Sequence, residues 1–221
     1  RTSRRQRQMC IRDRLYTMHD PKYNYLYETE PEPFMNNRKM FCPRGKMLGG
    51  SSSHNGMVHV RGNPMDFENW AQKDLKSWNY NNVLPYFKKS ESIEGLDETY
   101  RNKSGPLKLS RSSEGNELSK VYLEAAEQAG YEINNDMNGY KQEGFGLMDT
   151  TIYGGRRQST SVTYLHPVIN RRNLTVITNT IVNKVIIENN KAIGVECTAG
   201  REIKKIHAEN EVILSAGAIN S

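Results

Sequence analysis

The sequence GKMLGGSSSHNGMVHVRGN occupies residues 45–63 and decides how the rest of the chain is interpreted. Two adjacent glycines and three serines precede a histidine, an asparagine and a further glycine. Glycine allows a backbone to approach a ligand closely or to adopt a positive φ. Successive serines add hydroxyl groups and backbone N–H groups that can face an anion. The stretch therefore suits the pyrophosphate of a dinucleotide or the edge of a flavin, and a flexible surface loop is the alternative.

The segments around this stretch carry clear secondary-structure signals. Residues 15–43 are polar and rich in Tyr and Pro, which predicts extended segments and loops. Asn63 is a plausible helix N-cap with Pro64 in the first helical position, and apolar residues follow at helical spacing. A second short helix is expected to begin between Asn79 and Asn82.

The second half of the chain changes from helical to β-rich patterns. A helix is expected over residues 118–129, with Gly130 as its C-terminal cap, and another in RQSTSVTYLHPVI, ending at Pro167 or shortly after. Between them, NNDMNGYKQEGFG indicates turns. The β-branched C-terminal part, with its Asn-Asn and Ala-Gly turns, predicts strands over 174–179, 181–188, 191–198, 202–207 and 211–215. The mixture indicates an α/β or α+β fold that is not a complete simple domain.

The net charge of the chain is misleading when it is taken as a whole. A charge of +6 on 221 residues would suggest a partner such as nucleic acid or an anionic surface. Residues 1–14 hold six arginines and one aspartate, however, so they supply +5 and the remainder is nearly neutral. We therefore expect no nucleic-acid partner.

The arginine-rich segment has an explanation at the level of codons. Reading CGT CGG CAG CGT CAG ATG TGT ATA AGA GAC gives residues 4–13 in order, and this resembles a translated transposase-type sequencing adaptor. We expect residues 1–14 to be an assembly artefact, which removes them from any argument about the fold. A basic nucleic-acid-binding arm and a transit peptide are the alternatives.

Cysteine, histidine and hydropathy patterns exclude several classes of site. With Cys10 set aside, Cys42 and Cys197 are far apart and in no metal-like spacing, which predicts free, buried thiols. The five histidines form no HxxxH or HxH cluster, so no metal site is expected. No apolar run approaches the roughly 20 residues of a membrane span.

Several stretches resemble the glucose-methanol-choline (GMC) family of FAD-dependent oxidoreductases. GKMLGGSSSHNG with VRGNPMDFENW resembles the first signature of this family, and VILSAGAINS resembles the start of the second. The stretches DMNGYKQEGFGLMDTTI, GRRQSTSVTYLHP and YETEPEPFMNNRKM are similar to the choline dehydrogenase branch. The resemblance covers residues 15–221 and implies the central part of the FAD-binding domain with part of the substrate domain. The GxGxxG unit expected before this segment and the catalytic histidine pair expected after it are missing, so no catalytic residue is assigned.

The resemblance also implies which residues lie against FAD. Val182 matches the position whose backbone meets the adenine; it is otherwise read as a plain core valine, and both readings can hold together. Ala216 and Gly217 lie where small residues let the chain pass close to the cofactor. The isoalloxazine and pyrophosphate would be lined by Gly49, Gly50, Ser51, Ser53, His54, Asn55 and Gly56.

Two histidines depart from the usual pattern of the family. His54 stands where an aliphatic residue is usual, and its placement in GG-x-S-S-H-N resembles choline oxidases, in which this histidine is bonded to the flavin 8α-methyl group. An imidazole nitrogen can add to that electrophilic methyl group, so a covalent FAD is one interpretation, and a noncovalent FAD against His54 is the other. His59, in place of an aromatic residue, is expected to be a structural strand residue.

In function, the resemblance implies a parent enzyme that oxidises a small alcohol. Choline would be converted to betaine aldehyde, a step of glycine betaine biosynthesis, and the electrons would pass through the flavin to a quinone or oxygen. The fragment itself is expected to be inactive. The alternatives are another alcohol or sugar dehydrogenase or oxidase of the family, or a truncated non-catalytic paralogue. A mitochondrial location at the matrix side of the inner membrane is expected in a eukaryote, and a cytoplasmic or peripherally membrane-associated one in a bacterium.

Overall fold

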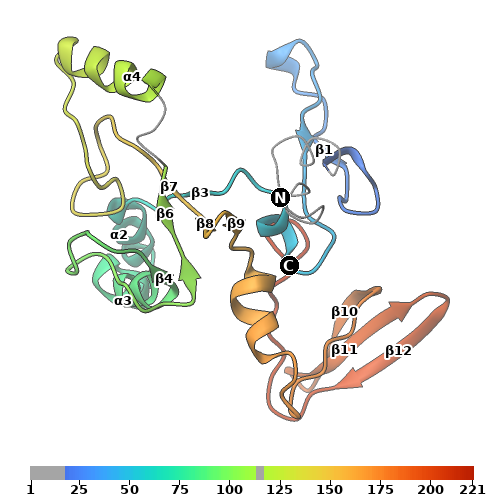
Figure 1. The fold of residues 1–221 in the computed structure, drawn as a ribbon. Coiled ribbons are helices and arrows are strands. Elements are labelled where there is room, and N and C mark those ends of the chain that lie inside the picture. Colours follow the sequence, from blue (N-terminus) through green and yellow to red (C-terminus); the bar gives the residue numbers. More distant parts are fainter. Residues whose placement is uncertain (1–17, 113–116) are drawn as a thin grey trace, which may run out of the picture. The chain divides into compact units, whose positions relative to one another are not determined.

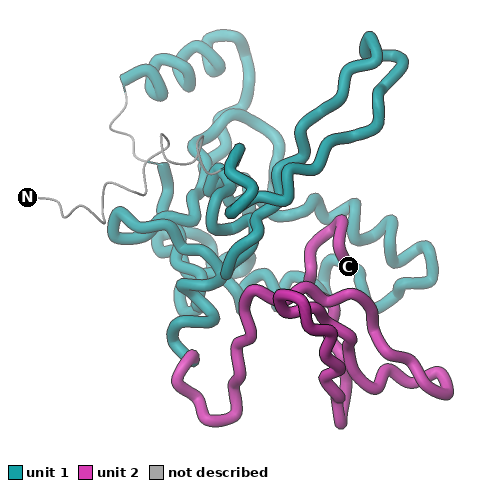
Figure 2. Tube along the Cα trace, turned by 90° about the vertical axis from the view of Figure 1, so that its right-hand side faces the viewer, with its two compact units in different colours: residues 1–168 teal, residues 169–221 magenta. Residues whose placement is uncertain are grey.

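The computed structural model describes residues 18–112 and 117–221 of the chain (Figure 1). The chain divides into two compact units, residues 1–168 and residues 169–221 (Figure 2). The first unit combines short strands, helices and long turns, whereas the second is a three-stranded sheet with flanking segments. This mixture of helix and sheet confirms the predicted fold class. The suspected adaptor segment lies outside the described residues.

Strands of the first unit are two residues long and form several small sheets. The three-stranded sheet has the order β3-β7-β6 and is antiparallel throughout. Its strands are β3 (Val58–His59), β7 (Asp149–Thr150) and β6 (Ser110–Arg111). The other paired strands of this unit are β1 (Tyr27–Glu28) with β2 (Phe41–Cys42), β4 (Glu91–Ser92) with the parallel β5 (Leu107–Lys108), and β8 (Ile152–Tyr153) with β9 (Arg156–Arg157).

Two capped helices follow the glycine-serine stretch, as the sequence predicts. Helix α2 (Pro64–Gln72) begins after Asn63, whose side chain accepts a 2.9 Å hydrogen bond from the Met65 N–H. Helix α3 (Tyr80–Ser90) begins after Asn79, whose side chain accepts a 2.9 Å bond from the Asn82 N–H. Each cap satisfies one of the N–H groups that a helix start leaves without an intrahelical partner.

An aromatic cluster joins these two helices and the 3₁₀ turn η4 (Lys76–Trp78) between them. Phe67 is buried at its centre. Its ring contacts Trp70 and Phe87 edge to face, at centroid distances of 5.3 and 5.6 Å. These are favourable aromatic geometries, so this small cluster supplies apolar packing to the helical part of the unit.

Two further helical segments fall close to where the sequence predicts helices. Helix α4 (Glu117–Gln128) is followed by Gly130, whose φ of 83° is the left-handed conformation expected of a C-terminal cap. The segment that was expected to end near Pro167 forms a π-helical turn, η5 (Ser161–Leu165), and a 3₁₀ turn, η6 (His166–Val168). Short 3₁₀ turns also form at η2 (Pro33–Met35) and η3 (Gly50–Ser53).

The second unit is an antiparallel meander with the order β10-β11-β12. Its first turn is Asn189-Asn190, and both residues have positive φ (49° and 61°), as a two-residue hairpin turn requires. Gly194 is needed in the middle strand, because a Cβ there would lie 2.2 Å from the carbonyl oxygen of Ile206. The strands are β10 (Thr180–Glu188), β11 (Lys191–Ala199) and β12 (Glu202–His207).

Two of the five predicted C-terminal strands are wrong. Residues 174–179 and 211–215 are not strands, and no described strand pairs with either. A β-branched run becomes a strand only where a neighbouring backbone completes its hydrogen bonds. Ile213 and Leu214 are instead 75% and 56% exposed. Residues 211–215 are largely apolar, but an apolar composition does not by itself provide a neighbouring strand to pair with.

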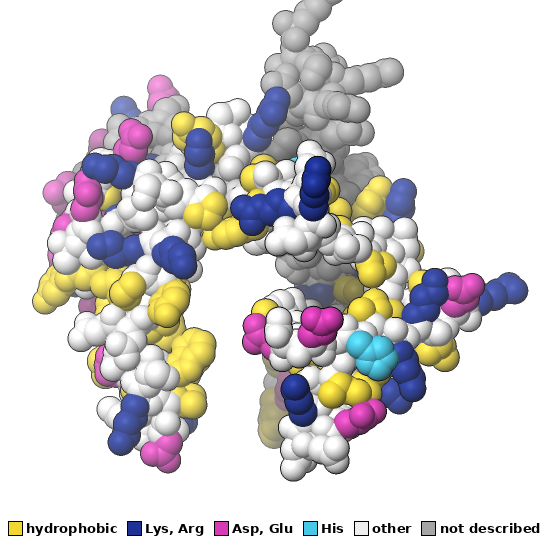
Figure 3. Space-filling view, turned by 90° about the horizontal axis from the view of Figure 1, so that it is seen from below, with side chains coloured by type: hydrophobic (Ala, Val, Ile, Leu, Met, Phe, Trp, Pro, Cys, Tyr) yellow, Lys and Arg dark blue, Asp and Glu magenta, His cyan; other side chains and the backbone are white. Residues whose placement is uncertain are grey.

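The surface carries mixed charge and exposed apolar groups. On the face drawn in Figure 3, basic and acidic side chains are interspersed, with hydrophobic groups exposed among them. Cys42 is a half-buried free thiol and Cys197 a buried one, so the prediction of two buried thiols holds for Cys197 alone. In the part of the chain that the structure describes, no helix is both long and apolar enough to cross a membrane.

Candidate functional site

The glycine-serine stretch forms a tight loop around η3. Gly49 and Gly50 have φ values of 86° and 51°, the left-handed conformation that L-residues with a Cβ adopt at a cost. A Cβ on Gly49 would lie 2.5 Å from Ser53 Oγ, so the loop closes on this position. A Cβ on Gly50 would meet nothing within 4 Å. The two glycines therefore have different surroundings, because Gly49 faces loop atoms and Gly50 faces open space.

The serine hydroxyls hold the loop to itself. Ser51 Oγ accepts a 3.0 Å hydrogen bond from the Gly45 N–H, and Ser53 Oγ donates a 2.8 Å bond to the Leu48 carbonyl. Ser52 Oγ donates to the Gly49 carbonyl. These bonds fix the backbone conformation of residues 45–53. The role of Ser51 and Ser53 as cofactor ligands stays a prediction.

A segment more than a hundred residues further along the chain supports this loop. Arg157 Nη1 donates to the carbonyl oxygens of Ser52 (3.2 Å) and Asn55 (2.8 Å) and to Asn55 Oδ1 (2.8 Å). The Thr160 N–H donates a 3.0 Å bond to Ser52 Oγ. Ser161 Cβ lies 3.1 Å from where a Cβ on Gly49 would stand. These supporting residues lie between Arg157 and Ser161, where the sequence predicts a helix but gives no sign of a contact with the loop.

The predicted residues at the end of the loop differ in exposure. The His54 side chain is buried, at 5% exposure, whereas Asn55 and Gly56 are exposed. Asn55 Oδ1 accepts a 3.1 Å bond from the Met57 N–H in addition to the bond from Arg157. Residues 49–56 thus form one contiguous loop in which His54 is buried and Asn55 and Gly56 are exposed.

The other predicted cofactor residues lie in the second unit. Val182 is in β10, opposite Cys197 of β11, and it is 54% exposed. Val182 is thus not buried in the described part of the chain. Ala216 and Gly217 are exposed, and Gly217 has a φ of 92°. Their contact with a cofactor stays a prediction.

A buried charge network is the feature that sequence reasoning missed. Glu91 and Arg101 are 0% and 1% exposed, and Arg101 Nε donates a 2.8 Å bond to Glu91 Oε1. Arg101 Nη2 donates a 2.8 Å bond to Asp149 Oδ2, and its Nη1 contacts Asp136. Arg61 Nη2 lies 2.8 Å from Glu91 Oε1. These five residues are scattered over the sequence with no spacing pattern, so no sequence signal identifies the network.

The network sets the protonation of its central carboxylate. Burial alone would raise the pKa of Glu91, but the hydrogen bonds from His59 and Arg101 and the charges of Arg101 and Arg61 lower it to about 2. His59 lies in β3, with Nε2 3.3 Å from Glu91 Oε2. The prediction that His59 is a structural strand residue is confirmed. A carboxylate held ionised by two arginines is unsuited to proton transfer near neutral pH, so the network is structural.

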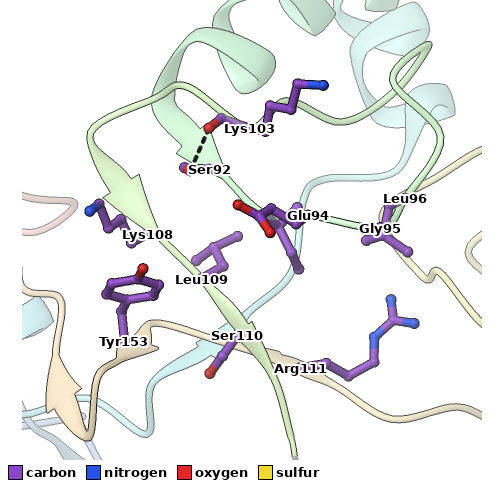
Figure 4. Close-up of a pocket in the computed structure, with 11 residues that line it drawn as sticks. Ser92, Glu94, Gly95, Leu96, Lys103, Lys108, Leu109, Ser110, Arg111 and Tyr153 are labelled. Atoms are coloured by element: carbon purple, nitrogen blue, oxygen red, sulfur yellow. Dashed lines mark hydrogen bonds between the residues drawn. The ribbon is translucent and has the colours of Figure 1, made fainter.

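A separate cavity of about 460 Å³ lies beside β5 and β6 (Figure 4). Its charged lining consists of Lys103, Lys108 and Arg111 against Glu94, and the Lys108 ammonium lies 4.7 Å from the centroid of the Tyr153 ring. An excess of positive charge repels a quaternary ammonium group. The cavity is therefore poorly suited to a substrate such as choline. Among the described residues, no group of three His, Cys, Asp or Glu side chains could hold a metal ion.

Comparisons with known proteins identify relatives along almost the whole chain. The family described as GMC oxidoreductase matches residues 9–221. Choline dehydrogenase of mitochondria from Mus musculus is 46% identical over 202 residues, which are 91% of this chain and 34% of that protein. The oxygen-dependent choline dehydrogenase of Brucella ovis is 44% identical over 206 residues, 93% of this chain and 37% of that protein. The chain thus spans about a third of the length of these relatives.

A solved structure supports the same relationship. A formate oxidase from Aspergillus oryzae RIB40, studied for the effect of a mutation on FAD modification, is 26% identical to the chain. It superposes with a TM-score of 0.76 over 89% of this chain and 36% of that one. The family and this neighbour imply FAD as the cofactor. The open side of Gly50 and the exposed Asn55 amide fit such a group, because they offer close backbone approach and hydrogen-bond donors.

Proposed function

The chain belongs to the GMC oxidoreductase family, and from this membership we propose that its full-length enzyme oxidises an alcohol with FAD as the electron acceptor. Choline is the proposed substrate and betaine aldehyde the product. Identity of 46% and 44% to two choline dehydrogenases supports this choice of substrate. FAD, when bound, accepts a hydride from the carbon that bears the hydroxyl group.

One structural observation carries the proposal. Residues 49–56 form a single loop that combines an open Gly50 with the exposed Asn55, and it is braced by Arg157 and Thr160. A rigid loop with an uncovered backbone is what close contact with a large planar cofactor needs. We propose that this loop contacts FAD. The resemblance to the family separately supports FAD contacts for Val182, Ala216 and Gly217.

The residues of this segment bind and orient, and do not perform proton transfer. Glu91 is ionised and enclosed by arginines, and His59 is hydrogen-bonded to it. Neither group is placed as a general base. We propose that the base acting on the substrate hydroxyl group lies outside this segment, as the resemblance to the family implies.

The proposed contact between FAD and His54 is either covalent or noncovalent, and an experiment can distinguish the two. A covalent bond would keep the flavin on the peptide that contains His54 after denaturation and proteolysis. A noncovalent cofactor would be released as free FAD, and that peptide would have its unmodified mass. Mass spectrometry of the holoenzyme, with His54→Ala as the control, decides between them.

The names of the relatives bear on the electron acceptor of the enzyme and on its cellular compartment. The mouse relative is mitochondrial, and the Brucella ovis relative is described as oxygen-dependent. We propose that the enzyme passes its electrons to a quinone or to oxygen. Oxygen consumption with choline, with and without an added quinone, separates these acceptors.

The test of the main proposal is a substrate comparison on the full-length enzyme. We expect the purified protein to show a flavin absorption spectrum that is bleached anaerobically by choline. An aryl alcohol and a sugar serve as matched controls. If the flavin is bleached by one of these and not by choline, the family assignment stands and the substrate assignment fails. A protein without flavin contradicts the whole proposal.

A further inference from the structure

The guanidinium group of Arg157 makes an unusual set of contacts. One nitrogen, Nη1, is the donor to three acceptors: the Ser52 carbonyl at 3.2 Å, and the Asn55 carbonyl and Asn55 Oδ1 at 2.8 Å each. All three acceptors lie in the loop proposed to contact FAD. Hydrogen bonds from a charged donor are stronger than those between neutral groups. Arg157 therefore concentrates its binding on the end of the loop.

These contacts fix the orientation of the Asn55 side-chain amide. Its Oδ1 receives a hydrogen bond from Arg157 Nη1 at 2.8 Å and another from the Met57 N–H at 3.1 Å. Arginine and a backbone N–H can only donate, so the atom facing both of them must be the amide oxygen. The Nδ2 group then points away from both, on a residue that is exposed.

A second contact braces the middle of the loop from the same segment. The Thr160 N–H donates a 3.0 Å bond to Ser52 Oγ, and Ser161 packs against Gly49. Arg157 is thus one end of a support that follows the loop from Gly49 to Asn55. Together with the Met57 N–H, it sets the orientation of the Asn55 amide.

We propose that Arg157 is a positioning residue for the cofactor: it holds the Asn55 amide so that Nδ2 donates to an acceptor oxygen of FAD. The inference rests on the proposed function, because FAD is the ligand. It adds a role for a residue outside the predicted cofactor-binding set. Arg157 acts through Asn55 and does not itself contact the flavin.

The structural half is tested on the 221-residue chain by hydrogen exchange. Arg157→Met should make the amides of Asn55 and Met57 exchange about tenfold faster, because the bonds that hold the loop end are lost. Arg156→Met is the matched control, since Arg156 is the exposed neighbour in β9 and its replacement should leave these amides unchanged. Arg157→Lys should restore part of the protection. Equal exchange in Arg157→Met and Arg156→Met would overturn the role of Arg157.

The cofactor half is tested on the full-length enzyme with FAD bound. Asn55→Asp keeps an oxygen for the bonds from Arg157 and Met57 but replaces the Nδ2 donor by a second carboxylate oxygen. We expect both Asn55→Asp and Arg157→Met to raise the Kd for FAD about tenfold, and Asn55→Asp alone to leave loop exchange unchanged. Asn55→Asp should also lower the reduction potential of the flavin, because a carboxylate opposes the negative charge of the reduced form.

The contact of Arg157 with the loop and the donor role of Asn55 toward FAD can be disproved separately. An Asn55→Asp enzyme that binds FAD as tightly as the wild type would overturn the donor role of Asn55 while FAD binding itself stands. A wild-type enzyme that carries no FAD would overturn the proposed function, and the hydrogen-exchange comparison would still judge the contact between Arg157 and the loop. Rescue of FAD affinity by Arg157→Lys supports a positional role of the charge.

Discussion

Glu91 and Arg101 form a buried ion pair whose two members are 0% and 1% exposed and whose Nε–Oε1 distance is 2.8 Å. Asp149 and Arg61 extend the pair into the network. Among the described residues of the first unit, four apolar residues are buried (Phe67, Ile93, Leu109 and Ala126), whereas ten buried residues are polar or charged. The buried residues of the first unit are therefore mostly polar, and the charge network lies among them.

Removing the charge of Glu91 should strongly destabilise the first unit. Glu91→Gln preserves the shape but leaves Arg101 and Arg61 without their shared carboxylate, and breaking a buried pair costs about 3–5 kcal/mol. Urea unfolding of the 221-residue chain measures the loss. Glu98→Gln is the control, because its ion pair with Lys103 is exposed and should change stability little. Equal stability of the two variants would contradict the structural role of the network.

The lowered pKa of Glu91 predicts that the free energy of unfolding decreases at acid pH. The pKa of Glu91 is lowered in the fold from 4.5 to about 2. Its contribution is therefore fully present above pH 4.5 and is lost as the pH falls from 4.5 toward 2, by about 3 kcal/mol in total. Unfolding free energies measured across this pH range should show the decline. In Glu91→Gln the decline should be shallower, and an identical slope in both proteins would contradict the assignment.

The two glycines of the loop should respond differently to substitution. Gly49→Ala places a methyl group 2.5 Å from Ser53 Oγ in a left-handed backbone, so we expect a loss of about 2–4 kcal/mol. Gly50→Ala meets no atom within 4 Å, so only the backbone cost of about 1 kcal/mol applies. In the full-length enzyme, however, Gly50→Ala should weaken FAD binding, because its methyl group occupies the open side. Unfolding and FAD titration of both variants check this pair of outcomes.

The 221-residue chain alone should neither retain FAD nor oxidise an alcohol. It spans about a third of its relatives and lacks the GxGxxG unit. Gel filtration with excess FAD, followed by an absorption spectrum and a dye-reduction assay with choline, tests this expectation. A flavin spectrum that persists together with alcohol-dependent dye reduction would show that the segment is sufficient by itself.

Local signals predicted the helices well, because the residues that start and end them are adjacent in sequence. Asn63 and Asn79 each accept the N-cap hydrogen bond, and Gly130 has the left-handed backbone of a C-terminal cap. The hairpin turn at Asn189-Asn190 was likewise predicted from the identity of these two residues alone. Strands at 174–179 and 211–215 were wrong, because pairing depends on a distant backbone that composition does not reveal.

The candidate site was predictable only in part, for the same reason. Residues 49–56 form one contiguous motif, and the structure confirms that they form one loop. Arg157 and Thr160 support that loop from more than a hundred residues away. Glu91, Arg101 and Asp149 meet through the fold alone. Contacts between residues distant in sequence leave no local pattern, so neither the support nor the network was foreseen.

The order of the second sheet has a consequence for handling the protein. β12 is an outer strand among the described residues, and its side chains are exposed along its whole length. Such an edge is a template for aggregation unless charge interrupts it. Lys204 and Lys205 stand in the middle of the strand between Ile203 and Ile206. These two lysines act as gatekeepers, so their neutralisation by acetylation would favour edge-to-edge association of chains into β-rich aggregates.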